Sequence, residues 1–235
     1  MSHKREFTTQ LQTRLSIQEI RKQTANTWKP AAAGMFYLLT LIGFIMLIAR
    51  IRDEPIWKFT GDPAEVMHYP AYIGALSSLG NLLWAMTAAV CLFGAIVVKQ
   101  HRASRITCHF FLASGMFSLI LCVDDLLLLH DHVIPALLHI PEGMLYLLYL
   151  TAILVYLTYF MPRILNYEYL LLGTSIVFFG LSRSILVVST FIDHIEIAAD
   201  ISKHFGIVFW LIFFYRTVLY EVNLLIREPT INPER

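Results

Sequence analysis

Six long apolar runs restrict this chain of 235 residues to one kind of fold. An α-helix needs roughly 20 mostly apolar residues to cross the hydrocarbon core of a bilayer. Runs of this kind cover about residues 31–50, 71–98, 107–132, 143–161, 168–188 and 204–225. Because the runs are continuous and do not alternate apolar with polar residues, they predict helices rather than the strands of a membrane β-barrel. The predicted fold class is all-α, a polytopic membrane helix bundle with about six transmembrane helices.

The composition agrees with a membrane location. Apolar residues make up 57% of the chain and charged residues 15%, whereas soluble domains carry roughly 25% charged residues. A net charge of +1 gives no reason to expect a nucleic-acid partner. We expect the lipid bilayer as the main partner, and a homo-oligomer or a subunit of a membrane complex as further partners.

The basic residues predict the orientation of the chain. With six spans, 13 of the 18 Lys and Arg residues fall on the side that holds both termini. Basic loops stay in the cytoplasm, so both termini are expected there (N-in/C-in), with the protein in the plasma (inner) membrane. The predicted parts are a basic cytoplasmic lead, 1–30, a six-helix transmembrane domain, 31–225, and a short cytoplasmic tail, 226–235.

The basic lead predicts either a membrane-surface helix or a solvated tail. Phe7, Leu11 and Leu15 recur every four residues among polar and basic residues, a pattern that suits an amphipathic helix on an anionic membrane surface. The lead is too long for the n-region of a signal peptide, so the first apolar run is expected to remain as an uncleaved helix.

An acidic, histidine-rich stretch, CVDDLLLLHDHVIPALLHIPEGM, joins the third apolar run to the fourth. Under the predicted topology it lies at the extracytoplasmic level, together with the start of the sixth run. Ionisable residues are rare at membrane depth and usually face the bundle interior, where they bind ions or move protons. The candidate metal ligands in these segments are Asp124, Asp125, His130, Asp131, His132, Glu142, Asp200 and His204.

Helical periodicity predicts which of these residues share a face. Residues seven apart lie about 20° apart around a helix. If the third helix continues to residue 132, Asp125 therefore shares a face with His132, and Asp124 shares a neighbouring face with Asp131. His130 falls off these faces and is expected to lie toward headgroups and water.

The last helix and the outer turn supply the other candidates. Asp200 and His204 are four apart, so their side chains are neighbours on a helix. Glu142 is expected in the short outer turn above the third helix. The alternative to a site is plain charge pairing, in which the acidic residues neutralise Arg183 or Lys203.

Carboxylates and imidazoles on facing helices are the groups that build metal sites in helical bundles. The expected cofactor is therefore a divalent metal ion of undetermined identity, which could activate water or oxygen beside a membrane-embedded substrate. No complete catalytic motif such as HExxH is present, so the sequence leaves open whether the protein is an enzyme. The alternatives are a relay of protons or cations and an accessory subunit. Apolar inner halves in the first, fourth and fifth runs favour a one-sided site over a path across the membrane.

Four segments carry a resemblance to a known family: SSLGNLLWAMTAAVCLFGA, DDLLLLHD, IPE and KHFGIVFWLIFFYRT. They resemble an uncharacterised family of bacterial multi-pass membrane proteins with a DDLxLLH[DE] motif. The resemblance implies a six-helix architecture and the same candidate site, but no reaction. Asp131 stands where the family usually has Glu, which preserves the carboxylate. Ala199 replaces the first acid of the family's acidic pair and leaves Asp200 alone.

Overall fold

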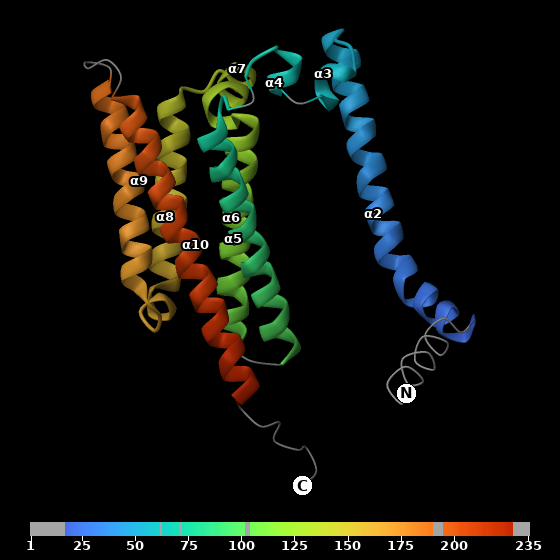
Figure 1. Ribbon diagram of the computed structural model, residues 1–235. Helices are drawn as coiled ribbons and strands as arrows, with labels where there is room; N and C mark the ends of the chain where they lie inside the picture. The colour runs from blue at the N-terminus through green and yellow to red at the C-terminus, as the bar shows by residue number, and fades with distance from the viewer. Residues whose placement is uncertain (1–16, 62, 71, 102–103, 190–194, 228–235) are drawn as a thin grey trace, which may run out of the picture. The chain divides into compact units, whose positions relative to one another are not determined.

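A computed structural model describes residues 17–61, 63–70, 72–101, 104–189 and 195–227 (Figure 1). The chain divides into two compact units, Met1–Ile73 and Gly74–Arg235, each of which is described by itself. Within the described ranges the secondary structure is helical, without strands. Six of the described helices are long and apolar enough to cross a membrane. This confirms the all-α, six-span prediction.

From residue 17 on, the described part of the first unit contains one long helix followed by two short ones. Its elements are α2 (Ile17–Arg52), α3 (Trp57–Thr60) and α4 (Pro63–Val66). The apolar part of α2, Thr27–Arg52, is the first candidate span. Helix α2 begins within the predicted basic lead, whereas Phe7, Leu11 and Leu15 lie outside the described residues.

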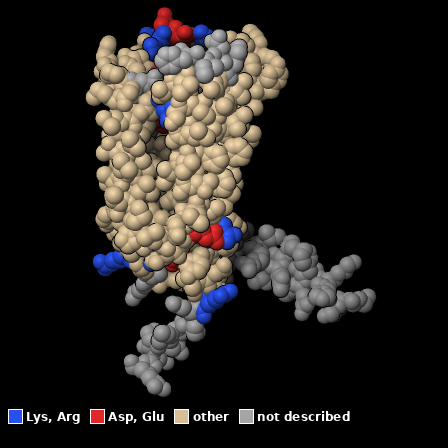
Figure 2. Space-filling model, turned by 90° about the vertical axis from the view of Figure 1, so that its left-hand side faces the viewer, with Lys and Arg blue, Asp and Glu red and all other residues tan. Residues whose placement is uncertain are grey.

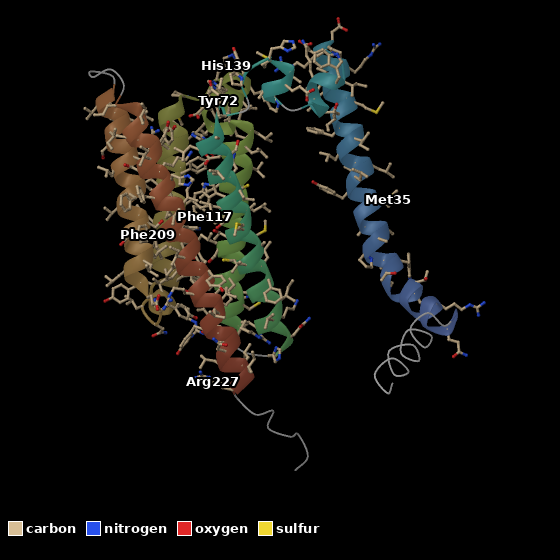
Figure 3. The ribbon with its side chains drawn as sticks, viewed as in Figure 1. Met35, Tyr72, Phe117, His139, Phe209 and Arg227 are labelled. Carbon is tan, nitrogen blue, oxygen red and sulfur yellow. The ribbon has the colours of Figure 1, made fainter. Side chains whose placement is uncertain are left out.

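The second unit is a bundle of five long helices with two short helical segments at one end. Its elements are α5 (Ala75–Gln100), α6 (Arg105–Leu127), the π-helix η1 (Leu129–Val133), α7 (Ile134–Leu138), α8 (Glu142–Ile164), α9 (Tyr169–Ser189) and α10 (Glu196–Arg227). The end of α6 and the starts of α8 and α10 lie at the same end of the bundle as η1 and α7 (Figure 1). We call this the η1 end. Figure 3 shows His139 at the η1 end and Arg227 at the opposite end.

The five long helices pack in an arc. Helix α5 packs against α6 on one side and α10 on the other, α9 packs against α10, and α8 lies against α6 and η1. Helices α8 and α9 are therefore the two ends of the arc. Aromatic side chains fill its interior, and the largest fully buried ones are Trp210, Phe110, Phe111, Phe213 and Phe214. The face of the bundle seen in Figure 2 is almost wholly uncharged along the length of the helices, as expected for helices in contact with lipid.

Two predicted helix boundaries are wrong, for identifiable reasons. The apolar run 107–132 predicts one helix, but α6 ends at Leu127 because Leu128 adopts a left-handed conformation with a φ of 50°. The last helix begins at Glu196, ahead of the start at 204 that hydropathy predicts, because the polar turn around Asp200 and Lys203 is also helical.

A glycine on α6 allows close contact with α5. A Cβ atom at Gly115 would lie 2.8 Å from Cγ of Leu92 and 3.2 Å from the backbone carbonyl oxygen of Ala88. Small residues are common where membrane helices touch, because they let the two backbones approach. Gly180 on α9 is different, since a Cβ atom there would have no neighbour within 4 Å.

We expect Gly115→Ala to lower the thermal stability of the purified protein. The added methyl group must displace the Leu92 side chain and a backbone carbonyl, and overpacking of this kind costs about 1–3 kcal/mol. Gly180→Ala is the matched control, because it meets open space and gains the higher helix propensity of alanine. Unfolding midpoints in detergent test this, and equal shifts for the two variants would show that α6 does not contact α5 through Gly115.

Candidate functional site

A break in the chain after α6 shapes the η1 end. Leu128 lies in the left-handed region, which residues other than glycine rarely occupy. Its backbone N–H closes the last turn of α6 by donating to the carbonyl oxygen of Asp124. The next five residues form the π-helix η1, a geometry that is frequent at functional sites. The break brings His130 back to the last turn of α6.

His130 is bound to Asp124 through both its backbone and its ring. The backbone N–H of His130 donates to Oδ1 of Asp124 at 3.0 Å, and Nδ1 lies 2.5 Å from Oδ2. Asp124 is 3% exposed and His130 is 9% exposed. A carboxylate with so little contact with water needs a close partner, because burial removes the hydration of its charge.

The second ring nitrogen of His130 faces another carboxylate. Nε2 lies 3.0 Å from Oδ1 of Asp131, and the hydroxyl of Tyr146 donates to the same oxygen at 3.2 Å. Burial alone would lower the pKa of His130, but the hydrogen bond and charge of Asp124, together with the charge of Asp131, outweigh burial and raise it. His130 therefore keeps its positive charge to a higher pH than a free histidine does.

Asp125 is neutralised from a different helix. Nζ of Lys203 on α10 lies 2.7 Å from Oδ1, and Nε1 of Trp84 on α5 donates to Oδ2 at 3.3 Å. The side chain of Asp125 is 14% exposed and that of Lys203 is 42% exposed. Lys203 thus reaches inward from a partly exposed position, and α5, α6 and α10 are joined at Asp125.

Asp124, Asp125 and His130 bring three metal-binding atoms together. The two carboxylate oxygens and the imidazole nitrogen all lie within 4.8 Å of one another. Within the described ranges, this is the one group of three such residues close enough to hold a metal ion. Chemically, the arrangement can hold a divalent ion, or it can share a proton between carboxylate and imidazole.

The other predicted ligands are placed differently. His132 and Asp200 are exposed, and their side chains have no hydrogen-bond or ion-pair partner among the described residues. His204 is half-buried and lies beside Gly80 of α5. Glu142 is the first residue of α8, and its side chain lies outside the part of the chain that the structure describes.

The predicted pairing by seven-residue spacing is wrong, because η1 does not continue α6. The left-handed Leu128 and the wider π-helical turn replace it with a contact between Asp124 and His130, six residues apart. His130, which periodicity places toward water, is instead buried.

Two partners of the site are absent from the sequence prediction. Trp84 and Tyr146 sit in apolar runs, where an aromatic residue is as common in the core as at a site, so their pattern carries no signal. The alternative that acidic residues pair with Lys203 is correct for Asp125. Arg183, the other cation named in that alternative, lies over the ring of Tyr146, with 3.4 Å between its guanidinium carbon and the ring centre.

Comparison with known proteins gives one match. Residues 32–217 match a family model described as a domain of unknown function, DUF8692. No similar chain was found among curated proteins or among solved structures. The matched region contains every residue of the candidate site.

Proposed function

Because this chain belongs to the DUF8692 family, whose function is unknown, we propose a function from its own residues: binding of a divalent metal ion by Asp124, Asp125 and His130. The observation that carries the proposal is the convergence of their three ligand atoms within 4.8 Å in a largely buried setting. Two carboxylates and one imidazole suit Mn²⁺, Fe²⁺ or Zn²⁺ better than Mg²⁺ or Ca²⁺, which prefer oxygen ligands alone.

The contacts of His130 support this proposal. When Nε2 carries the ring proton and donates it to Asp131, Nδ1 presents a lone pair to the oxygen of Asp124. Two acceptors at 2.5 Å repel each other unless a positive charge lies between them. In the metal-free protein that charge is a proton, and a metal ion can replace it. Asp131 then orients the imidazole from behind, as carboxylates behind metal-bound histidines commonly do.

Lys203 supplies the balance of charge. It neutralises Asp125 in the absence of an ion, and its side chain is 42% exposed. A divalent ion brings enough positive charge for Lys203 to turn toward water when the ion binds. The long, flexible stem of lysine makes this movement inexpensive.

The position of the site in the membrane is part of the proposal. The distribution of Lys and Arg supports cytoplasmic termini and an extracytoplasmic site in the plasma (inner) membrane.

A bound ion would act as a Lewis acid on water next to a membrane-embedded substrate. Of the other predicted ligands, Asp131, His132, Asp200 and His204 fall outside the three-residue group, and the side chain of Glu142 lies outside the described part of the chain.

Metal binding is tested with paired histidine variants. We expect the purified protein to bind one Mn²⁺ or Zn²⁺ ion, and His130→Gln to weaken binding by about tenfold or more. His132→Gln, an exposed neighbour in η1, is the control and should bind as the wild type does. Binding should strengthen as pH rises, because the raised pKa of His130 means that the ion must displace a proton. Titration calorimetry and elemental analysis measure both quantities.

The Asp131→Asn variant tests whether metal binding can be weakened while the protein stays folded. It keeps a hydrogen-bond partner for Nε2 but removes the charge, so binding should weaken by about ten- to hundredfold while the protein stays monodisperse. Equal metal content in the wild type and in His130→Gln would refute the proposal.

A path for protons is the second candidate function, and a buried polar stripe along α6 favours it. Thr107, Ser114 and Ser118 are fully buried, and steps of 100° per residue place all three on the same face as Asp125. The hydroxyl of Ser114 lies 2.6 Å from that of Tyr156. Hydroxyl groups therefore follow one face of α6, which is not one of the three runs with an expected apolar inner half.

The stripe ends in a charged cluster away from the η1 end. Arg163 donates to the hydroxyl of Thr107 and pairs with Glu221 at 3.1 Å. Tyr167 donates to the same oxygen of Glu221 at 2.6 Å. Ionisable groups near both ends of a hydroxyl stripe are the arrangement that a proton relay requires.

Proton flux into liposomes tests this second function. If the stripe conducts, Ser114→Ala should reduce flux under a pH gradient because it removes a hydroxyl from the path. Ser184→Ala, at an exposed position on α9, is the control and should conduct normally. Flux equal to that of protein-free liposomes would exclude conduction and leave metal binding as the proposed function.

A further inference from the structure

Arg183 is a cation within an apolar span. It lies in α9 six residues before Ser189, the last residue of the helix, which corresponds to roughly 9 Å along the axis. Its one described contact of note is with the ring of Tyr146 on α8. Among the described residues it has no carboxylate partner, so the donors of its guanidinium group have no described acceptor. A cation within an apolar span is costly and usually functional.

Arg183 and Tyr146 lie on the two helices that end the arc. Figure 2 shows a hollow in the uncharged surface of the bundle, with a Lys or Arg side chain at its upper edge. Arg183 and Lys203 are the described basic residues on the helices at the η1 end. Exposed apolar side chains lie one helical turn from Tyr146 and Arg183: Leu150 on α8 is four residues after the tyrosine, and Val187 on α9 is four residues after the arginine.

We propose that the surface between α8 and α9, where Arg183 lies over the ring of Tyr146, binds the phosphate-bearing headgroup of an anionic membrane lipid, with Arg183 as its ligand. The planar guanidinium matches two phosphate oxygens with two parallel hydrogen bonds. Tyr146 stacks against the guanidinium and holds it in place. The acyl chains of the lipid remain among the exposed apolar side chains of α8 and α9, which a free phosphate ion could not use.

The headgroup site adjoins the candidate metal site. The hydroxyl of Tyr146 donates to Asp131, and the same oxygen of Asp131 faces Nε2 of His130. One aromatic ring therefore links Arg183 to the carboxylate that orients His130. An anionic phospholipid that enters sideways from the bilayer is then the substrate class of the metal site. This extension rests on the proposed function, whereas lipid binding at Arg183 does not require a metal ion.

Lipid binding is tested in the absence of metal, so that its outcome is independent of the metal site. Full-length protein treated with EDTA is titrated with phosphatidylglycerol or phosphatidylcholine, and bound lipid is counted by native mass spectrometry. The wild type should prefer phosphatidylglycerol, Arg183→Gln should weaken that binding by about tenfold, the loss of a charge-assisted contact, and Arg183→Lys should fall between them. Arg216→Gln is the control, because Arg216 is exposed and pairs with Glu168.

The result expected for a lipid site is that excess inorganic phosphate does not displace phosphatidylglycerol. Displacement by inorganic phosphate would overturn the proposal in favour of a free-anion site. Equal phosphatidylglycerol binding by Arg183→Gln and the wild type would also overturn it. Metal titration of the same Arg183→Gln protein distinguishes the two proposals: intact metal binding with lost lipid binding supports the headgroup site and leaves the metal site standing.

Discussion

Two adjacent carboxylates at the end of an apolar span must be neutralised, and the structure of the η1 end follows from that requirement. A carboxylate at the centre of a bilayer costs roughly 2.5–3.5 kcal/mol on insertion scales, and two neighbours also repel each other. Asp124 and Asp125 each have a separate cation, His130 and Lys203. The break at Leu128 brings the first into place, and the early start of α10 brings the second.

A divalent metal ion can take the place of both cations, the proton on His130 and the ammonium group of Lys203. His130 holds a proton between Asp124 and Asp131, and the partly exposed Lys203 can move away from Asp125. A site neutralised by a proton and a flexible lysine can accept a divalent ion without leaving any carboxylate unpaired. Arg183, which has no carboxylate partner among the described residues, lies on the other side of the Tyr146 ring from this site. The proposed cation site inside the bundle and the proposed anion site at its lipid-facing surface are thus adjacent.

Hydropathy predicted the six spans correctly, because the length of an apolar run is set by the thickness of the bilayer. It also indicated that acidic and histidine residues gather near the end of α6, since such residues stand out in leucine-rich sequence. The pairing of Asp124 with His130 could not be predicted. The break lies within Leu126–Leu129, four identical residues without Gly or Pro, so nothing in the local sequence marks a left-handed residue. The buried stripe of Thr107, Ser114 and Ser118 was missed because hydroxyl groups hardly alter the hydropathy of a span.

The central claim is that Asp124, Asp125 and His130 form one cation-binding centre. Anomalous diffraction from crystals of the protein soaked in Mn²⁺ measures it most directly, because the signal locates the ion itself. The account predicts one strong peak bounded by the two carboxylates and Nδ1 of His130, with Lys203 turned away from Asp125. A peak at Asp200 and His132 instead, or occupied crystals with no peak beside Asp124, would contradict it.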